Sequence, residues 1–461
     1  MATHQIDSLI KFTNSQSISA TGTLVQVTRN SIVMEVYNPY SIVQLSEVLN
    51  DLHIRRKDRI IYKGRAVVST LVNTGLYLVV SATLVDPWQD LSGVEQDTRS
   101  IQEEAQRFLT DWETSYQLEP SFQLTVTEIR SLLLELNRWM EHVDLFSKDD
   151  GITHTQEATE ILFKQLQEVI APTLQEKFAV FEYEAGKIPE SEKNSHRKFA
   201  QRDLHPLLLR SPFIWRSFSK PLGYAGDYEM VNMMIRNPNE GPTSYAQLMN
   251  AMFLATGPAL AHRNRIDILC QRITDQINIA KSENRVFKAL NIGCGPAIEI
   301  QRLIENGVID EQCEFTLLDF NDETLAYTQH TLEKLSKGKP LNITFVHKSV
   351  HELLVEAIRT SDDAKEESYD MVYCAGLFDY LANRVCSRLL RLLYKRTNDN
   401  GITLVTNVHP NNPVINTMEY LLEWHLIYRD EQQMLDLLDA PCKNKVYVDD
   451  STVNTFMEMY K

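Results

Sequence analysis

The sequence has little of what marks a secreted, membrane-spanning or metal-binding protein. Its 461 residues include only 6 cysteines and no C-x-x-C pair, so we expect neither a disulfide framework nor a metal site. No uninterrupted apolar run is long enough to cross a bilayer. The first residues, MATHQIDSLIKFTNS, lack the basic head and apolar core of a signal peptide. We therefore expect a cytoplasmic protein without an integral membrane segment.

Positive charge is also in deficit. Lysine and arginine total 46 against 62 aspartate and glutamate, which gives a net charge of −16. Such a chain repels a phosphate backbone, and no basic stripe interleaved with aromatic residues offsets the repulsion. Nucleic acid is therefore not expected as a partner. The hydrophobic content of 43% is typical of a globular protein, and the length allows two or three domains.

The most informative stretch lies between residues 286 and 321. It predicts a buried strand, a tight turn at Gly293-Cys294-Gly295, a helix, and a second strand that stops on Asp319. Glycines let the backbone approach a ligand closely and present N–H donors at a helix N-terminus. An acid at the end of the next strand can accept both hydroxyls of a ribose. The pattern predicts a nucleoside site, with an ordinary glycine-containing turn as the alternative.

Two absences narrow the choice of nucleoside. Ile298 stands where a dinucleotide fingerprint needs its third glycine, and no G-K-[ST] follows, so NAD, FAD and a Walker loop are disfavoured. The turn and acid instead resemble the first two motifs of class I S-adenosylmethionine-dependent methyltransferases, in which the turn takes the methionyl end of the cofactor. Asn291, where an acid is usual, and Ala297, where glycine is usual, depart from that pattern.

The first part of the chain, residues 1–92, predicts a small antiparallel β-barrel. Strand-like runs alternate with polar turns at a spacing of roughly ten residues. The strand pattern and the hairpin expected at KGRAVVSTLVNTG resemble a PilZ-like domain. Only Arg29-Asn30-Ser31 is similar to half of the motif that grips cyclic di-GMP in that family. We therefore expect a structural or protein-docking role rather than nucleotide sensing.

The next part, residues 93–204, predicts long amphipathic helices, because its apolar residues recur three and four positions apart. Pro172 is expected to kink or divide the second of these helices. A helical spacer or bundle is the simplest interpretation, and lining of a substrate tunnel is the alternative. We expect a homodimer through this region or through the barrel.

The run HPLLLRSPFIWRSFSKPLGYAGDYEMVNMM, at 205–234, predicts a long loop that enters a helix at Asp227, because prolines and glycines interrupt it. Its second half, KPLGYAGDYEMVN, together with AHRNRIDIL, resembles the bacterial methyltransferase family of 3-hydroxypalmitic acid methyl ester biosynthesis. The resemblance implies a methyltransferase domain over 205–461 with a lid segment at 205–245. It also implies that Tyr224 and Asp227 close over the cofactor.

Strands and helices continue to alternate after Asp319. The chain thus predicts an α/β fold, a Rossmann-like class I methyltransferase domain preceded by the barrel and the helical region. Ligands of such sheets bind outside the carboxyl ends of the strands, which puts the ends of five predicted strands on one rim. On this basis and on the resemblance, the expected cofactor-binding residues are Tyr224, Asp227, Arg263, Arg265, Gly293, Cys294, Gly295, Asp319, Phe320, Asn321, Ser349, Val350, Ala375 and Gly376.

The acceptor is less well defined than the cofactor. A carboxylate is ionised at neutral pH and needs only a cationic clamp, whereas a phenol or an amine needs a base, for which His409 is best placed. The stretch 418–438, which we expect to form an apolar helix, carries Arg429 and suits a fatty carboxylate, although core packing explains the same residues. The expected catalytic residues are Tyr224, His409 and Arg429, and the expected acceptor-binding residues are Tyr380, Asn407, Trp424, Tyr428 and Arg429.

The resemblance implies an enzyme that O-methylates the carboxylate of a (3-hydroxy) fatty acid or a related acyl compound, a small-molecule or lipid-like acceptor. Two alternatives stay open. One is a methyltransferase for the amine or carboxylate of a small polar metabolite. The other is a binding or signalling protein whose degenerate methyltransferase domain only senses the cofactor, as Asn291 and Ala297 would allow.

Overall fold

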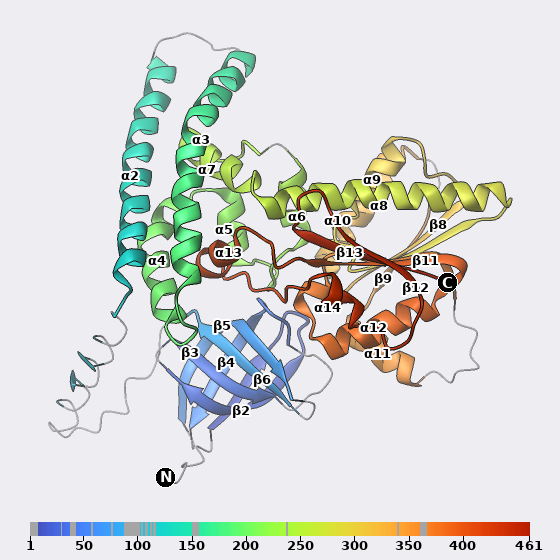
Figure 1. Ribbon diagram of the computed structural model, residues 1–461, viewed down its shortest axis with the longest axis horizontal. Coiled ribbons are helices and arrows are strands. Elements are labelled where there is room, and N and C mark those ends of the chain that lie inside the picture. The colour runs from blue at the N-terminus through green and yellow to red at the C-terminus, as the bar shows by residue number, and fades with distance from the viewer. Residues whose placement is uncertain are drawn as a thin grey trace.

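The chain folds into a closed barrel, a helical region and a seven-stranded sheet with helices on both faces, in that order along the sequence (Figure 1). This confirms the expected α/β fold class. The computed structural model describes residues 8–28, 30–36, 43–56, 59–74, 77–86, scattered residues between 102 and 113, and residues 117–149, 156–236, 238–338, 341–359 and 367–461.

The barrel closes in the strand order β1-β2-β3-β6-β5-β4, with every neighbouring pair antiparallel. Alternate residues of β3, namely Ile32, Met34 and Val36, point into its core, as the period of two requires. The strands are β1 (Ser8–Thr13), β2 (Ser19–Val27), β3 (Ser31–Val36), β4 (Val48–Arg56), β5 (Arg59–Asn73) and β6 (Leu78–Leu84).

Details of the barrel differ from the sequence-based expectation. The stretch KGRAVVSTLVN belongs to β5, a single strand of 15 residues, and the hairpin turn follows it, where the Thr74 N–H donates to the Tyr77 carbonyl. Strands β1 and β4 were not predicted, since β4 carries five polar or charged side chains among its nine residues. Arg29 lies outside the described residues, and the likeness to a PilZ-like domain stays a prediction.

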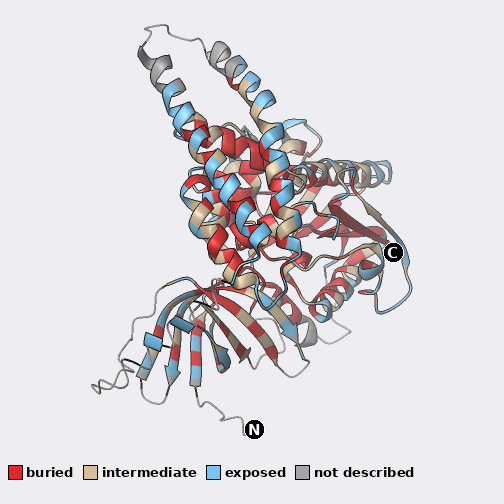
Figure 2. Ribbon diagram, turned by 60° about the vertical axis from the view of Figure 1, so that its left-hand side comes forward, coloured by how far each residue is buried: buried red, intermediate tan, exposed pale blue. Residues whose placement is uncertain are grey.

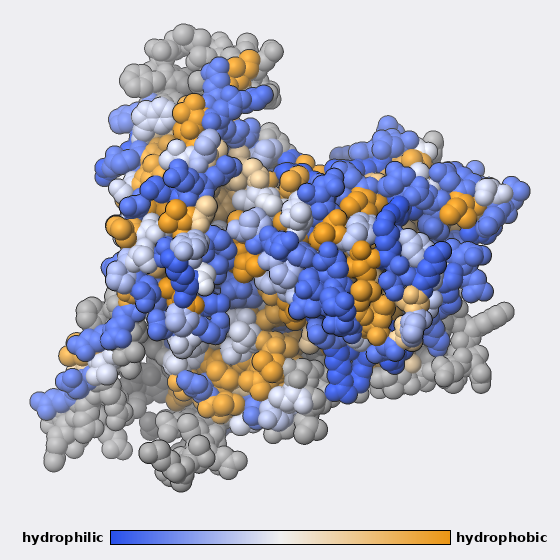
Figure 3. All heavy atoms as spheres, in the orientation of Figure 1, coloured by the Kyte–Doolittle hydropathy of each residue, from blue (hydrophilic) through white to orange (hydrophobic). Residues whose placement is uncertain are grey.

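Three long helices follow the barrel: α2 (Pro120–Asp149), α3 (Gln156–Gly186) and α4 (Lys193–Leu208). Their buried residues lie on the inner faces and their exposed residues on the outer faces (Figure 2). Pro172 neither ends nor divides α3. Exposed large apolar side chains, among them Leu124 and Trp139, remain on α2, and hydrophobic residues show among hydrophilic ones over α2 and α3 (Figure 3). The homodimer stays a prediction.

The expected entry into a helix at Asp227 is confirmed, but the loop expected before it is partly helical. Helix α4 continues through Pro206, and Pro212 starts α5 (Pro212–Ser219), because proline fits the first turn of a helix. Residues 209–211 and 220–227 remain non-repetitive before α6 (Tyr228–Ile235). Helices α7 (Ser244–Leu254) and α8 (Gly257–Ser282) then lead into the sheet.

The sheet has the order β12-β13-β11-β10-β7-β8-β9, and β13 is the one strand of this sheet that runs in the opposite direction to the other six. The order reverses between β7 and β10, so a ligand is expected at the carboxyl ends of these two strands. The strands are β7 (Phe287–Ile292), β8 (Cys313–Asp319), β9 (Asn342–His347), β10 (Tyr369–Cys374), β11 (Thr397–Val408), β12 (Lys443–Val448) and β13 (Asn454–Tyr460).

Helices cover both faces of the sheet (Figure 1). Helix α8 packs with α9 (Ile298–Glu305) and α10 (Asp322–Leu335) on one face. The other face carries α11 (Val350–Arg359), α12 (Asn383–Lys395) and α14 (Glu431–Leu435). The short helices η1 (Phe378–Tyr380) and α13 (Ile415–Leu421) lie in the loops after β10 and β11. The continuous helix expected at 418–438 is not formed: residues 422–430 are non-repetitive between α13 and α14, and Glu423 has a φ of +48°, which a helix does not accommodate.

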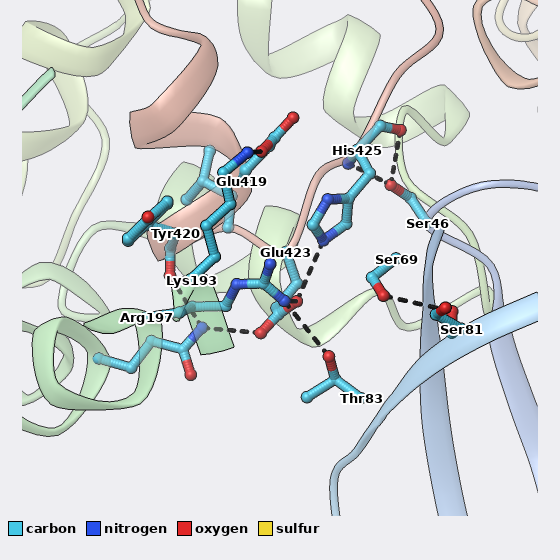
Figure 4. Close-up of polar contacts among 12 residues, drawn as sticks. Ser46, Ser69, Ser81, Thr83, Lys193, Arg197, Glu419, Tyr420, Glu423 and His425 are labelled. Atoms are coloured by element: carbon cyan, nitrogen blue, oxygen red, sulfur yellow. Dashed lines mark hydrogen bonds and ion pairs between the residues drawn. The ribbon is translucent and has the colours of Figure 1, made fainter. Parts of the chain in front are cut away.

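Buried polar contacts join the barrel to the rest of the chain (Figure 4). The Ser46 hydroxyl donates to the His425 carbonyl and accepts from the His425 N–H. Arg197 of α4 donates to Thr83 of β6 at 3.3 Å and pairs with Glu423 at 3.0 Å. These contacts fix the barrel against both the helical region and the segment that follows α13.

The six cysteines are free, and four of them are buried. Among the described residues, no helix combines the length and apolar character needed to span a bilayer.

Candidate active site

The glycine turn lies at the carboxyl end of β7, where its backbone is held by the neighbouring strand. The N–H groups of Gly293 and Cys294 both donate to the Leu318 carbonyl, at 2.8 and 3.0 Å. Gly295 has a φ of +52°, which favours glycine, and a Cβ there would meet no atom within 4 Å. The space beside Gly295 is therefore open to a ligand.

Asp319 lies at the end of β8 beside this turn, as the sequence predicts. Its carboxylate accepts from the N–H groups of Gly295 and Asn321, each at 3.1 Å, and it is buried. Burial raises the pKa of Asp319, although the hydrogen bonds oppose the shift. Each oxygen keeps lone-pair capacity for a further donor, such as a ribose hydroxyl.

A single pocket brings most of the expected cofactor residues together. Its empty space, including the solvent at the open mouth, is about 1470 Å³. The expected residues that line it are Tyr224, Arg265, Gly293, Cys294, Gly295, Asp319, Phe320, Val350, Ala375, Gly376, Tyr380 and Trp424. Their individual roles stay predictions.

Tyr224 reaches the pocket from the loop before α6, but Asp227 does not. The Tyr224 ring lies 5.0 Å from the Phe320 ring, and its hydroxyl is 3.4 Å from that of Thr324. Burial, with a smaller contribution from Asp319, raises the pKa of Tyr224. Asp227 instead caps α6 by accepting from the Met230 N–H and pairs with Arg216 at 2.9 Å, so it organises the loop rather than the ligand.

The two arginines of AHRNRIDIL have different surroundings. Arg263 donates to the carbonyls of Met234 and Leu254, which joins the ends of α6 and α7 outside the pocket. Arg265 lines the pocket, is 7% exposed, and makes no hydrogen bond or ion pair with any residue that the structure describes. Its guanidinium would lie 2.8 Å from a Cβ at Gly376. The pocket carboxylates of Asp379 and Glu299 partly offset the burial of this cation. Its N–H groups, which donate to no described residue, are available to an anionic ligand.

Arg429 is not placed to clamp an acceptor. It is 1% exposed, and all five of its N–H groups are used: they donate to the carbonyls of Phe378 and Leu381 and to the side chains of Asn383 and Asn407. No donor is left for a carboxylate. The side-chain amide of Asn407 donates to the Val408 and Ile427 carbonyls. Arg429 and Asn407 together therefore hold the loops behind the pocket.

His409, Tyr428, Ser349 and Asn321 also lie outside the pocket lining. The His409 Nδ1 accepts from the Asn411 N–H and its Nε2 faces Glu431 at 3.2 Å, so neither ring nitrogen is free. Ser349 exchanges hydrogen bonds with Glu352 as the cap of α11, and Asn321 caps α10. The Tyr428 hydroxyl is buried and has no partner among the described residues.

Several pocket residues were not expected from the sequence. Glu299 accepts from the Tyr373 hydroxyl at 2.8 Å and from the Asn291 amide at 3.1 Å, and burial raises its pKa. Glu299 supplies a carboxylate beside position 291, where the sequence has asparagine. Its position about one turn after the glycine turn could have indicated this from the sequence. The others include His262, Leu377, Asp379, Asn412, Met418, Leu426 and, from the barrel, Gln16, Gln44 and Leu45.

Comparison with known proteins agrees with this geometry. Residues 289–401 match the family described as "Methyltransferase domain". The chain carries a methyltransferase domain. Because the matched span contains the glycine turn and Asp319, this domain is that of an S-adenosylmethionine-dependent enzyme. No curated protein sequence matches the chain.

Solved structures similar to part of the chain include the following three proteins. A "possible exported protein" from Bordetella parapertussis is 15% identical, with a TM-score of 0.39, over 54% of this chain and 86% of the other. Magnesium protoporphyrin IX methyltransferase from Synechocystis is 10% identical, with a TM-score of 0.32, over 44% of this chain and 84% of the other. An N-methyltransferase from Bradyrhizobium japonicum is 13% identical, with a TM-score of 0.30, over 51% of this chain and 97% of the other. Likeness at this level carries no argument about the acceptor.

Proposed function

We propose that the chain methylates the carboxylate of a fatty acid, a 3-hydroxy fatty acid or a related acyl compound, and so forms a methyl ester. The observation that carries the proposal is the apolar part of the pocket wall. The segment after β11 contributes Met418, Trp424 and Leu426, and the barrel contributes Leu45. Apolar and aromatic walls suit an aliphatic chain.

The residues of the pocket fit S-adenosylmethionine, which supplies an electrophilic methyl group when bound. We assign the ribose hydroxyls to Asp319 and the methionyl carboxylate to Arg265. The support is that Asp319 keeps acceptor capacity beside the open space at Gly295, while the buried guanidinium of Arg265 donates no hydrogen bond to the described residues. A guanidinium binds a carboxylate through charge-assisted hydrogen bonds.

The histidines near the pocket favour an acceptor that is already ionised. Both ring nitrogens of His409 are engaged, and the pKa of His262 falls to about 3, chiefly because of burial. Neither imidazole is suited to remove a proton at neutral pH. A carboxylate, whose ordinary pKa is near ~4, needs no such base.

The test is a methyl-transfer assay on the purified chain with palmitate and 3-hydroxypalmitate, in which mass spectrometry detects the methyl ester. We expect the rate to be flat between about pH 6 and 8, because nothing on a carboxylate acceptor titrates there. A rate that rises about tenfold per pH unit would instead indicate an amine or a phenol. No ester from either acid would contradict the proposed acceptor.

One observation favours a second candidate, the amine of a small metabolite. Asp379 lines the pocket, and burial raises its pKa, while its carboxylate already accepts from the Val408 N–H. A buried carboxylate can hold an ammonium group or accept its proton. Asp379→Asn separates the two candidates, since it should abolish turnover of an amine and leave ester formation within about threefold.

A further inference from the structure

The barrel contributes part of the pocket wall, although it lies far from the methyltransferase domain in the sequence. Gln16 comes from the turn between β1 and β2, and Gln44 and Leu45 from the turn before β4. Leu45 is buried, and the two glutamines are partly buried. The pocket is therefore incomplete without the barrel.

Both turns are held in place by one buried carboxylate. Glu47 accepts from the Ser15 N–H at 2.9 Å, from the Ser15 hydroxyl, and from the Gln44 N–H at 2.8 Å. Asn14 adds two bonds within the first turn, because its side-chain oxygen accepts from the N–H groups of Gln16 and Ile18. Backbone positions fixed in this way present side chains at defined places.

The same part of the barrel is fixed to the loop that carries Tyr224. The Val48 N–H donates to the Gly223 carbonyl at 2.7 Å, and a Cβ at Gly223 would lie 3.3 Å from the Ser15 side chain. The hydrogen bonds between Ser46 and His425 lie next to this contact in the sequence and join the barrel to the segment of Trp424 (Figure 4). The barrel turns thus have a fixed position relative to the pocket.

The side-chain amides of Gln16 and Gln44 have no hydrogen-bond partner among the residues that the structure describes. The Gln16 Oε1 is fully buried in that state. A buried amide oxygen without a donor costs free energy until a ligand supplies one. An amide is neutral and both donates and accepts, so it matches a hydroxyl and offers no countercharge to a phosphate or an ammonium group.

We propose that Gln16 and Gln44 recognise a hydroxyl group on the acceptor, with the hydroxyl donating to the Gln16 Oε1. This inference rests on the proposed function, because it concerns the acceptor of the same pocket. It makes the barrel a specificity element of the enzyme. Leu45, beside them, contacts the aliphatic part of the acceptor.

The experiment compares kcat/KM for 3-hydroxypalmitate and palmitate in the wild-type chain and in Gln16→Leu and Gln44→Leu. We expect the wild type to prefer the hydroxylated acid about tenfold, the value of one well-placed hydrogen bond. The preference should fall to about one in Gln16→Leu, mainly through loss of rate with 3-hydroxypalmitate. Gln26→Leu is the matched control, since Gln26 lies on β2 with an exposed side chain, and should keep the wild-type preference.

Calorimetry with S-adenosylhomocysteine provides the second readout, in which Gln16→Leu should bind within about twofold of the wild type. Much weaker binding would place Gln16 at the cofactor and overturn the proposal. Equal kcat/KM for the two acids in the wild type and in every variant would overturn it while leaving the proposed ester formation intact. Failure of the wild type to methylate either acid would overturn both.

Discussion

At the scale of single residues, Asp319 is the side chain on which cofactor binding is expected to depend most. We predict that Asp319→Ala weakens binding of S-adenosylmethionine and S-adenosylhomocysteine by about 1.5–3 kcal/mol, through loss of charge-assisted hydrogen bonds to the ribose. Isothermal calorimetry measures the change. Asp322→Ala is the control, because the Asp322 side chain is 86% exposed in the first turn of α10. Equal affinity in the two variants would remove Asp319 from the site.

Arg429 shows how a residue that looks functional in the sequence becomes structural in the fold. We predict that Arg429→Leu lowers the free energy of unfolding by about 3–5 kcal/mol, because it leaves buried oxygens without donors. Urea unfolding measures the loss, and Arg391→Leu is the control, since Arg391 pairs with Asp439 at the surface. A stable Arg429→Leu chain with a raised KM for the acceptor would restore Arg429 as a clamp.

At the scale of elements, the loop between α5 and α6 reaches the pocket, as do Tyr228 and Val231 of α6. Lys220, Gly223 and Gly226 all have positive φ there, and a Cβ at Gly226 would lie 2.9 Å from the Tyr380 hydroxyl. The loop is thus packed closely against the pocket wall. We conclude that the loop positions Tyr224, while Asp227 and Arg216 hold the loop itself.

We predict that Tyr224→Phe lowers kcat about tenfold and changes cofactor affinity less than about threefold, because the hydroxyl orders a loop that excludes water. Stopped assays and calorimetry separate the two quantities. Tyr245→Phe is the control, since the Tyr245 hydroxyl is buried in α7 without a described partner and outside the pocket. Full activity in Tyr224→Phe would show that this tyrosine serves packing alone.

At the scale of the whole molecule, Glu47 makes the stability of the folded chain depend on pH, because it holds the barrel turns that line the pocket. Burial raises the pKa of Glu47 from 4.5 to about 7. A carboxyl whose pKa is higher in the folded chain stabilises that chain below pH 4.5, and the contribution is lost as the pH rises to about 7. With about 1.4 kcal/mol per pKa unit, we predict a loss of about 3 kcal/mol.

Urea unfolding between pH 4.5 and 8 tests this prediction. The difference in free energy of unfolding between Glu47→Gln and the wild type should increase in favour of the variant by about 3 kcal/mol over that range. The control is Glu35→Gln, because Glu35 is a partly exposed carboxylate on β3 of the same barrel. A constant difference for Glu47→Gln would mean that its pKa does not move on folding.

The sequence by itself determined most of the elements and the placement of the glycine turn beside Asp319. The strand, the glycine turn and Asp319 are adjacent in the chain, and local rules of backbone geometry suffice to join them. Periodicity likewise gave the long helices and most of the strands. It failed where a proline could start or sit within a helix, as at Pro172 and Pro212, because packing of the helix outweighs one lost hydrogen bond.

Only the tertiary structure decided which side chains face the pocket. Arg263 and Arg265 are two residues apart, yet one ties two helices together and the other is a buried cation in the pocket. His409 and Arg429 follow β11 in the sequence, but their side chains make hydrogen bonds to neighbouring loops instead of facing the pocket. Gln16 and Gln44 join the site from the barrel. The physical reason is that burial and hydrogen-bond satisfaction are set by segments distant in the sequence, and no local pattern records them.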